Sequence, residues 1–327
     1  MLPTYSIAIR TLGTAGEKFK KELDSIVAQT IKPEKVVIYI AQGYKRPDYT
    51  IGIEEYVEVP KGMVSQRALD YTEIPSEYIL MLDDDIELHP NSAKLLLQSA
   101  TENSADCITV DLYQNHRMSF VSKIYNIFSN LIFPFYSKKW SRKILSNGSI
   151  SYNNNPSNYK FYNAQAGEGG ASLWRKGIIN KLNLRDEKWL DELDFAYADD
   201  QLIFYKIHVN GFKLGTLYNT DVKHLDSGTA RKSYQTNPTK FITRSQASFI
   251  IWYRTLFDLP NISIIKKMYR LLSFILKQIW LKPILLIAAF RYRNCKIPYF
   301  HFKGIWKGIK FISSIKYKNI PNYIIRK

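Results

Sequence analysis

The chain has 327 residues, of which 46% are hydrophobic, and a formal net charge of +17. A chain of this size can bury a full core, and its length suggests one large domain with additions, or two domains. Its two cysteines, Cys107 and Cys295, argue against a disulfide framework and a cysteine metal site. No uninterrupted run of about eighteen apolar residues is present, so we expect no transmembrane helix. The first residues lack a basic segment followed by an apolar core, so we expect no signal peptide and a cytoplasmic protein.

The positive charge is unevenly distributed along the chain. Fifteen of the 46 basic residues and none of the 29 acidic residues lie in residues 259–327, so the rest of the chain is nearly neutral. A second acid-free stretch, residues 112–167, mixes aromatic side chains with seven basic residues. Such mixtures are typical of segments at the surface of an anionic membrane, and also of segments that bind single-stranded nucleic acid. The apolar content of residues 271–289 favours the membrane, and we expect no nucleic-acid partner.

Strands and helices alternate in the first hundred residues. Apolar patterning predicts strands over residues 5–10, 35–41, 56–59 and 78–82, and helices over residues 17–29, 64–71 and 90–102. This alternation predicts an α/β fold with a mostly parallel central sheet flanked by helices.

The patterns continue after residue 102 with longer irregular segments. We expect strands over residues 106–113 and 213–218, a helix over residues 199–209 that stops at Asn210-Gly211, and basic helices beyond residue 258. Between them lie an Asn-rich loop at residues 153–156 and the glycine-rich residues 167–170, which permit close backbone approach.

Three consecutive aspartates, Asp83, Asp84 and Asp85, follow the apolar strand over residues 78–82. Aspartates often mark solvated turns, which is the alternative to a functional role. Here the carboxylates stand at the carboxyl end of a buried strand, where open α/β sheets bind their ligands. Clustered carboxylates suit a hard divalent cation. The sequence therefore predicts a Mn²⁺ or Mg²⁺ site that holds phosphates.

Residues 4–228 resemble the inverting GT-A glycosyltransferases of family 2, of the bacterial surface-polysaccharide type. The resemblance rests on short motifs in the expected order: Ile9-Arg10-Thr11, Leu23-Asp24-Ser25-Ile26-Val27-Ala28-Gln29-Thr30, Leu82-Asp83-Asp84-Asp85 as the DxD motif, Trp189-Leu190-Asp191-Glu192, Tyr197-Ala198-Asp199-Asp200-Gln201 and Val222-Lys223-His224. The resemblance implies a GT-A fold and transfer of a sugar from a nucleotide diphosphate.

The resemblance assigns the metal to the DxD motif. Asp85 is the first-choice ligand, and Asp83 or Asp84 would contact the ribose hydroxyls or a metal-bound water, with Asp83 also a candidate ligand. His224 would bind the metal or the diphosphate, while the alternative is an ordinary surface or core histidine.

The same pattern makes Asp200 the base that accepts the acceptor proton, with Asp199 beside it. The alternative for this pair is capping and dipole stabilisation at the start of a helix, which does not exclude catalysis.

The resemblance also suggests contacts to the donor. Thr11 and Arg67 would meet the nucleotide base, and Gln42 stands where many relatives carry an aspartate that reads uracil. Glu168, Gly169 and Gly170 would contact donor sugar or acceptor, with Trp174 as a candidate neighbour.

We thus expect a metal-dependent hexosyltransferase that uses a nucleotide sugar, a UDP-sugar by the resemblance, and acts on a lipid-linked or cell-surface glycan at the inner face of the cell membrane. We expect a catalytic domain at residues 1–258, with a basic aromatic insertion at about 114–150, and a membrane-associating extension at 259–327. The alternatives are a nucleotidyltransferase and a non-catalytic membrane or nucleic-acid adaptor. Residues 11–16 form a poor phosphate loop because they lack a basic residue, which disfavours the nucleotidyltransferase.

Overall fold

The structure is a computed structural model that describes residues 2–112, 124, 127–128, 139–153, 155–194, 197–226 and 237–325. Its described strands form one ten-stranded sheet in the order β3-β2-β1-β4-β10-β6-β11-β9-β7-β8 and a separate two-stranded ribbon, β5-β12. The strands are β1 Tyr5–Thr11, β2 Val36–Ala41, β3 Glu54–Val59, β4 Tyr78–Asp83, β5 Ile86–Glu87, β6 Cys107–Val110, β7 Trp140–Ile144, β8 Ile150–Tyr152, β9 Phe161–Ala164, β10 Ala171–Arg175, β11 Leu214–Leu217 and β12 Lys223–His224.

The sheet is mixed, with parallel pairing over its first half. Strands β3, β2, β1 and β4 are parallel, as are β6 with β11 and β7 with β9. Strand β10 runs antiparallel to both β4 and β6. The predicted α/β class with a mostly parallel central sheet is therefore confirmed.

Helices cover both faces of the sheet, as buried strands require. Alternate residues of β1 point to opposite cores: Ile7 and Ile9 pack with α1 (Glu17–Val27) and α2 (Ser92–Asn103), whereas Ala8 belongs to the core on the other face. That second core includes α4 (Lys176–Leu182), the 3-10 helix η1 (Leu184–Glu192) and α5 (Asp199–Val209). The carboxyl ends of β1 and β4 and the start of α5 thus meet at one edge of the sheet.

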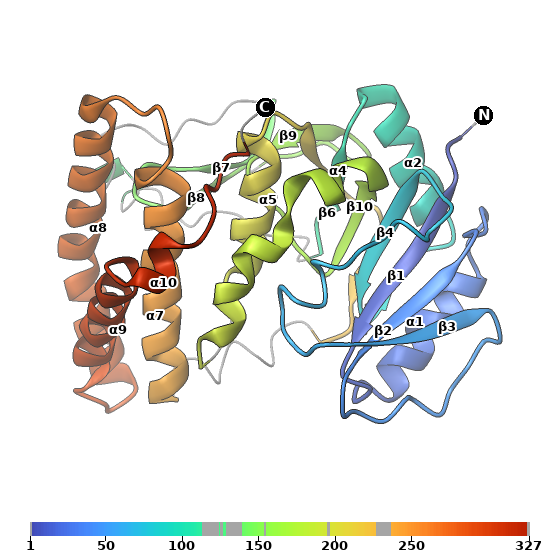
Figure 1. The fold of residues 1–327 in the computed structure, drawn as a ribbon, viewed down its shortest axis with the longest axis horizontal. Coiled ribbons are helices and arrows are strands. Elements are labelled where there is room, and N and C mark those ends of the chain that lie inside the picture. Colours follow the sequence, from blue (N-terminus) through green and yellow to red (C-terminus); the bar gives the residue numbers. More distant parts are fainter. Residues whose placement is uncertain are drawn as a thin grey trace.

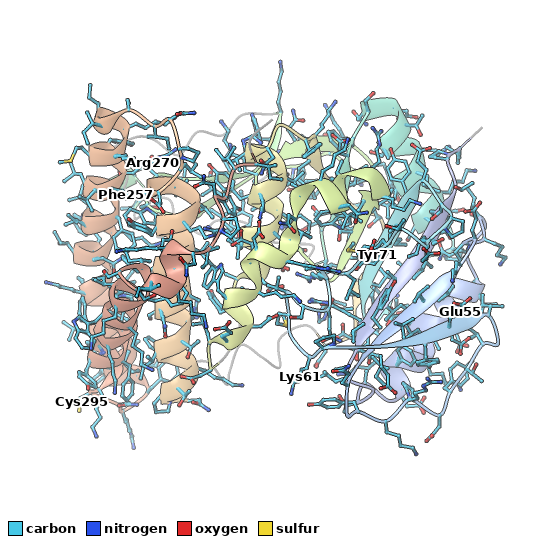
Figure 2. The ribbon with its side chains drawn as sticks, viewed as in Figure 1. Glu55, Lys61, Tyr71, Phe257, Arg270 and Cys295 are labelled. Atoms are coloured by element: carbon cyan, nitrogen blue, oxygen red, sulfur yellow. The ribbon has the colours of Figure 1, made fainter. Side chains whose placement is uncertain are left out.

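A helical layer follows at the opposite end of the molecule from β3 (Figure 1). It consists of α7 Pro238–Trp252, the π-helical turn η2 Tyr253–Phe257, α8 Ile264–Arg291, α9 Ile297–Ile312 and α10 Ile315–Lys318. Gly304 and Gly308 lie one turn apart on α9, and a Cβ on either would collide with α7. The two glycines therefore let α9 pack directly against α7. Figure 2 shows Phe257 and Arg270 in this layer, far from Tyr71 beside the sheet.

A buried ion-pair network joins the helical layer to the sheet domain. The Glu187 carboxylate in η1 accepts hydrogen bonds from Arg254 of η2 at 2.7 and 2.8 Å and from Lys206 of α5 at 3.0 Å. Glu187 and Lys206 are fully buried. Burial by itself would raise the pKa of Glu187, but Arg254 and Lys206 outweigh it and lower the pKa below its ordinary value. The carboxylate is therefore ionised and holds two cations.

We expect Glu187→Gln to lower the free energy of unfolding at pH 7 by about 3–5 kcal/mol, because it leaves buried cations without their counter-charge. The lowered pKa means that this stabilisation is complete above the ordinary glutamate range and is lost as the pH falls through the lowered value. The difference between variant and wild type should therefore shrink in acid. Urea unfolding at several pH values measures it. Glu192→Gln is the matched control: its half-exposed carboxylate pairs with Lys316, so a change under about 1 kcal/mol is expected.

Most predicted elements agree with the structure, but the helix predicted over residues 64–71 is wrong. This segment forms a series of turns. Asp191 accepts hydrogen bonds from the backbone N–H groups of Val64 and Ser65 at 2.9 and 2.8 Å and from the Ser65 hydroxyl. A distant carboxylate thus holds the backbone in a conformation that helical patterning cannot anticipate.

Two further expectations change in the C-terminal half. Helix α8 has 28 residues and contains an 18-residue stretch with a mean hydropathy of 1.7, so it is long and apolar enough to cross a membrane by length and composition. The sequence contains no uninterrupted apolar run here, because single lysines interrupt the apolar residues of α8. The boundary at residue 258 remains a prediction, although α7 and α9 pack together across it. Residues 140–144 of the predicted insertion form β7 of the main sheet, β8 begins at its last residue, Ile150, and most of residues 113–138 lie outside the described residues.

Candidate active site

An arginine that the sequence analysis left without a role holds the first aspartate of the DxD motif. Arg10, on β1, lies beside Asp83 of β4 in the parallel register and makes a two-pronged contact: Nε donates to Oδ1 and Nη2 to Oδ2, the latter at 3.0 Å. Burial would raise the pKa of Asp83, but Arg10 and Arg67 outweigh it and lower the pKa. Asp83 is therefore ionised and both its oxygens are engaged.

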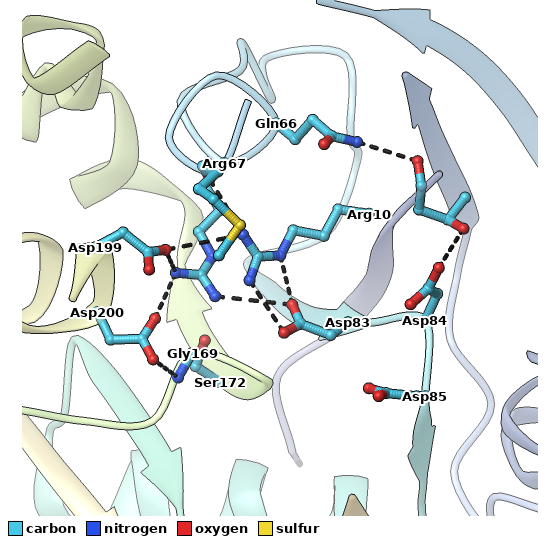
Figure 3. Close-up of polar contacts among 12 residues, drawn as sticks. Arg10, Gln66, Arg67, Asp83, Asp84, Asp85, Gly169, Ser172, Asp199 and Asp200 are labelled. Carbon is cyan, nitrogen blue, oxygen red and sulfur yellow. Dashed lines mark hydrogen bonds and ion pairs between the residues drawn. The ribbon is translucent and has the colours of Figure 1, made fainter. Parts of the chain in front are cut away.

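A second arginine joins the DxD strand to the start of α5. Arg67 Nη1 donates to Asp199 and, at 2.6 Å, to Asp200, while Nη2 lies 3.7 Å from Asp83 (Figure 3). Only 6% of the Arg67 side chain is exposed. Its own burial would lower the pKa of Arg67, but Asp199 and Asp200 raise it, so the guanidinium keeps its charge. Arg67 is thus a bridge between the two acidic elements.

Asp199 and Asp200 differ in environment although they are adjacent. Asp199 is buried, and burial together with the Asp200 charge raises its pKa. The Asp200 side chain is 37% exposed and accepts a hydrogen bond from the Gly169 N–H at 3.0 Å. Asp200 is therefore the member of the pair that a bound molecule can reach.

Asp84 takes part in a separate chain of hydrogen bonds. It accepts one from the Thr11 hydroxyl, which itself accepts from the Gly13 N–H at 2.7 Å. The Thr11 carbonyl accepts from Gln66 Nε2 at 3.2 Å. These contacts fix the end of β1.

Asp85 stands apart from the arginines (Figure 3). It faces His224. The Asp85 Oδ1 and His224 Nε2 atoms are 3.6 Å apart. The antiparallel ribbon sets this position, because Ile86 pairs with His224 and the Leu225 N–H donates to the Asp85 carbonyl at 2.9 Å. Burial raises the pKa of Asp85, although the nearby His224 opposes it. Two residues that are 139 positions apart thus form one pair of candidate metal ligands.

A carboxylate and an imidazole in this arrangement suit Mn²⁺ or Mg²⁺ only in part. In the described residues, no group of three or more His, Cys, Asp or Glu side chains is placed to hold a metal. A divalent ion at Asp85 and His224 would therefore need further oxygen ligands from a bound phosphate, which is the usual arrangement for Mg²⁺. Because His224 Nδ1 lies 3.3 Å from the Asp226 N–H, a metal at Nε2 would also require the ring proton to move to Nδ1. The pair fits as half of a metal site that substrate completes.

Gly169 lets the backbone approach the arginine bridge. A Cβ at this position would collide with the Asp200 carboxylate and the Arg67 guanidinium. Gly170 is similarly close to Leu112 and Ile86. The glycines therefore fix how closely β10 meets the acidic cluster.

We expect Gly169→Ala to displace Asp200 and to lower kcat/KM of the proposed transfer by about tenfold or more, since small misplacement of a reacting group is costly. Steady-state kinetics with a donor identified as described below measures it. Gly177→Ala, on α4, is the control because a Cβ there meets nothing within 4 Å, and its activity should equal that of the wild type.

Several predicted contacts are not as expected. Glu168 is buried and accepts hydrogen bonds from Arg142 and, at 2.6 Å, from the Leu112 N–H. These contacts hold the chain next to Gly169 in place. Trp174 is 1% exposed and packs on Phe204 in the core. Gln42 is exposed at the end of β2.

Two charged residues of the cluster are held by other side chains of the cluster. Arg67 contacts Asp199 and Asp200, and both oxygens of Asp83 accept from Arg10, while the contacts of Arg67 with a nucleotide base and of Asp83 with a metal stay predictions.

Comparison with known proteins yields structural similarity alone. No protein-family model matches the chain, and no curated protein sequence does. The chain is similar to a crystal structure of GalNAc-T7 with UDP, GalNAc and Mn²⁺. The identity is 14% and the TM-score 0.49, and the match covers 83% of this chain and 55% of that chain. The chain thus spans just over half the length of that protein.

The structure therefore brings Asp83, Asp199, Asp200 and Arg67 together, and places Asp85 with His224 beside them. Arg10, Gln66 and Arg142 also contact this cluster or the residues that support it, and the motifs did not predict a role for them. A basic residue at the end of β1, one position before Thr11, was the available signal for Arg10.

Proposed function

We propose that the protein is a metal-dependent inverting glycosyltransferase that moves a sugar from a nucleotide-diphosphate donor to a hydroxyl group of a glycan. One observation carries the proposal: a buried arginine ties the partly exposed Asp200 to Asp83 at the end of β4, and Asp85, two positions further on, faces a histidine. The edge thus combines a base with the start of a metal site.

The proposed reaction is a single displacement. The acceptor hydroxyl oxygen attacks the anomeric carbon, and the bond between the anomeric carbon and the diphosphate oxygen breaks. Asp200 takes the hydroxyl proton. Arg67 holds Asp200 by a 2.6 Å hydrogen bond and the Gly169 N–H donates to its other oxygen, so the base is oriented before substrate binds. The nucleoside diphosphate leaves with the bonding electrons.

Asp85 and His224 would hold Mn²⁺ or Mg²⁺ together with the donor phosphates. The metal would neutralise the charge that develops on the diphosphate as it leaves. Asp83, held by Arg10, would set the position of the strand end and add no ligand. A UDP-sugar is the donor we propose to test first.

Thermal unfolding with a panel of nucleotide sugars tests donor and metal together. A true donor at about a hundred times its Kd should stabilise the fold by about 2.7 kcal/mol, and only when Mn²⁺ is present. Asp85→Asn should abolish the Mn²⁺-dependent shift. Asp106→Asn, at the position before β6 begins, is the control that should retain it. A shift that survives in Asp85→Asn, or a panel in which no donor shifts the wild type, would contradict the proposal.

We also propose that the C-terminal helices associate with the inner face of the cell membrane. Apolar side chains on α8 and α9 are exposed, with Phe290 at 88% and Ile287 at 67%, next to lysines and without a single acidic residue in 259–327. An exposed apolar face with flanking lysines is what binds anionic lipid surfaces. The acceptor glycan would accordingly be lipid-linked or at the cell surface.

Flotation with anionic vesicles tests the membrane proposal. The double variant Ile287→Glu with Phe290→Glu should stay unbound, because both side chains are exposed and their replacement leaves the packing of α7 against α9 intact. Ile53→Glu is the control: that side chain is 56% exposed in the loop before β3, at the other end of the molecule, so flotation should be unchanged. Equal flotation of all three proteins would be incompatible with this surface.

A further inference from the structure

A cavity of about 690 Å³ lies between the start of α5 and the C-terminal helices. Ala198 and Gln201, which flank the Asp199–Asp200 pair, form one wall. The turn between β7 and β8 forms another, and α7, α8 and α9 form the rest. The cavity therefore begins next to the proposed base and extends away from the donor edge.

The lining of the cavity combines apolar walls with positive charge. Phe249, Phe274, Leu281 and Leu285 are among its apolar residues, and none of the described lining residues is Asp or Glu. The charge comes from Arg244, at the exposed rim, and from the half-buried Lys277. Lys277 Nζ donates to the Asn147 carbonyl at 3.1 Å, and the Arg244 guanidinium lies 5.0 Å from the Tyr197 ring centroid.

Arg244 is close enough to Lys277 to disfavour the charge of the lysine. Burial and the nearby Arg244 lower the pKa of Lys277 to about 8. Burial, Lys277 and Arg244 together lower the pKa of His301, on the α9 side of the cavity, to about 4. An anion between Lys277 and Arg244 would offset both the burial and the repulsion. The cavity thus has the electrostatics of an anion site inside an apolar pocket.

We propose that this cavity binds the lipid phosphate of the acceptor: a phosphate ester on a long hydrocarbon chain, with the phosphate at Arg244 and Lys277 and the chain along the apolar walls. The attached glycan would then extend toward Asp200. This inference rests on the proposed function for the role of the bound lipid, but the binding itself does not depend on a donor.

The position of α8 supports a lipid as the occupant. Leu281 and Leu285 of this helix line the cavity, whereas Leu286, Ile287 and Phe290 are exposed. The same helix therefore borders the cavity and carries the surface proposed to meet the membrane. A ligand drawn from that membrane would enter the cavity beside α8, and the positive charge of Arg244 and Lys277 favours a phosphorylated one.

Calorimetric titration with dodecyl phosphate below its micelle concentration tests the site in the full chain. The wild type should bind it saturably at one site, and should bind inorganic phosphate and dodecanol at least about tenfold more weakly, since each lacks half of the recognised structure. Lys277→Met should weaken dodecyl phosphate by about tenfold to a hundredfold. Ala288→Phe, which fills part of the cavity, should weaken it without removing charge. Lys282→Met, on the same helix outside the lining, is the matched control and should bind as the wild type does.

The proposal would be overturned if wild type, Lys277→Met and Ala288→Phe bound dodecyl phosphate equally. It would also be overturned if Lys282→Met lost as much affinity as Lys277→Met, or if the wild type bound inorganic phosphate as tightly as dodecyl phosphate. Melting temperatures identify a variant that has failed to fold, and the binding of the other cavity variant then tests the proposal. The Mn²⁺-dependent donor shift should persist in Lys277→Met. If the wild type does not bind dodecyl phosphate but shows the Mn²⁺-dependent donor shift, the cavity assignment is wrong and the proposed function stands. If the wild type binds dodecyl phosphate but no donor shifts its melting temperature, the proposed function alone is overturned.

Discussion

Asp200→Asn is expected to lower the rate of sugar transfer by about 10²–10⁴-fold while leaving donor binding unchanged. The loss is that of a positioned general base, which contributes this much to proton transfer. Asparagine has the same size, and its single amide oxygen can keep one of the two hydrogen bonds, from Arg67 or from the Gly169 N–H, but it cannot accept the acceptor proton. Initial rates of transfer and the Mn²⁺-dependent thermal shift, measured on the same preparation, separate the two effects.

The matched control is Asp194→Asn, an exposed aspartate close to α5 in sequence whose side chain lies 3.8 Å from Lys307. Its rate should equal that of the wild type. If Asp200→Asn keeps the wild-type rate, Asp200 is not the base. If it loses donor binding together with the rate, Asp200 serves the donor.

Arg67→Met is expected to lower the free energy of unfolding by about 3–5 kcal/mol, because it removes the closest counter-charge of the buried Asp199 carboxylate and leaves it only Arg10, at 3.9 Å. Methionine keeps much of the apolar volume of the side chain, so most of the loss should come from charge. Denaturant unfolding measures it, and Arg46→Met, at an exposed position, should change stability by less than about 0.5 kcal/mol.

A second substitution tests whether the loss is electrostatic. Adding Asp199→Asn to Arg67→Met removes the stranded charge and should restore part of the stability, giving a coupling of about 1–3 kcal/mol between the two positions. Additive effects of the two substitutions would show that Arg67 acts through packing and that the bridge has no energetic role.

The parts of the site that the sequence predicts are those with local signals. Asp83, Asp84 and Asp85 end an apolar run, and Asp199 begins a helix, so strand and helix patterns place them at element ends. Parallel strands carry their carboxyl ends to the same edge, which brings such positions together.

The contacts between these positions have no local signal. Arg10 and Asp83 are 73 positions apart, and Arg67 and Asp199 are 132 apart. Residues 64–71 have a helical pattern but form turns, because Asp191 binds the backbone of Val64 and Ser65, which lie 127 and 126 positions before it. Strands β7, β8 and β9 lie in a segment whose basic and aromatic composition suggests a membrane surface, and the pairing of β7 with β9 depends on their sheet neighbours.

The burial of individual residues was equally hard to predict. Glu168 lies among three glycines, a composition typical of an exposed loop, yet Arg142 of β7 holds it in the interior. The exposed and buried sides of α8 depend on where α7 and α9 pack, which Gly304 and Gly308 determine.

The products of the reaction test the central claim most directly. The wild type is incubated with the donor that gives the largest thermal shift, with Mn²⁺ or with EDTA, and the nucleotide products are separated by ion-exchange chromatography. Water takes the place of the glycan hydroxyl and receives the sugar: a glycosyltransferase with its metal at Asp85 and His224 releases the nucleoside diphosphate and free sugar with Mn²⁺ and neither with EDTA, and Asp85→Asn releases neither under either condition. Release of nucleoside monophosphate or inorganic diphosphate, or an intact donor under every condition, would contradict the account.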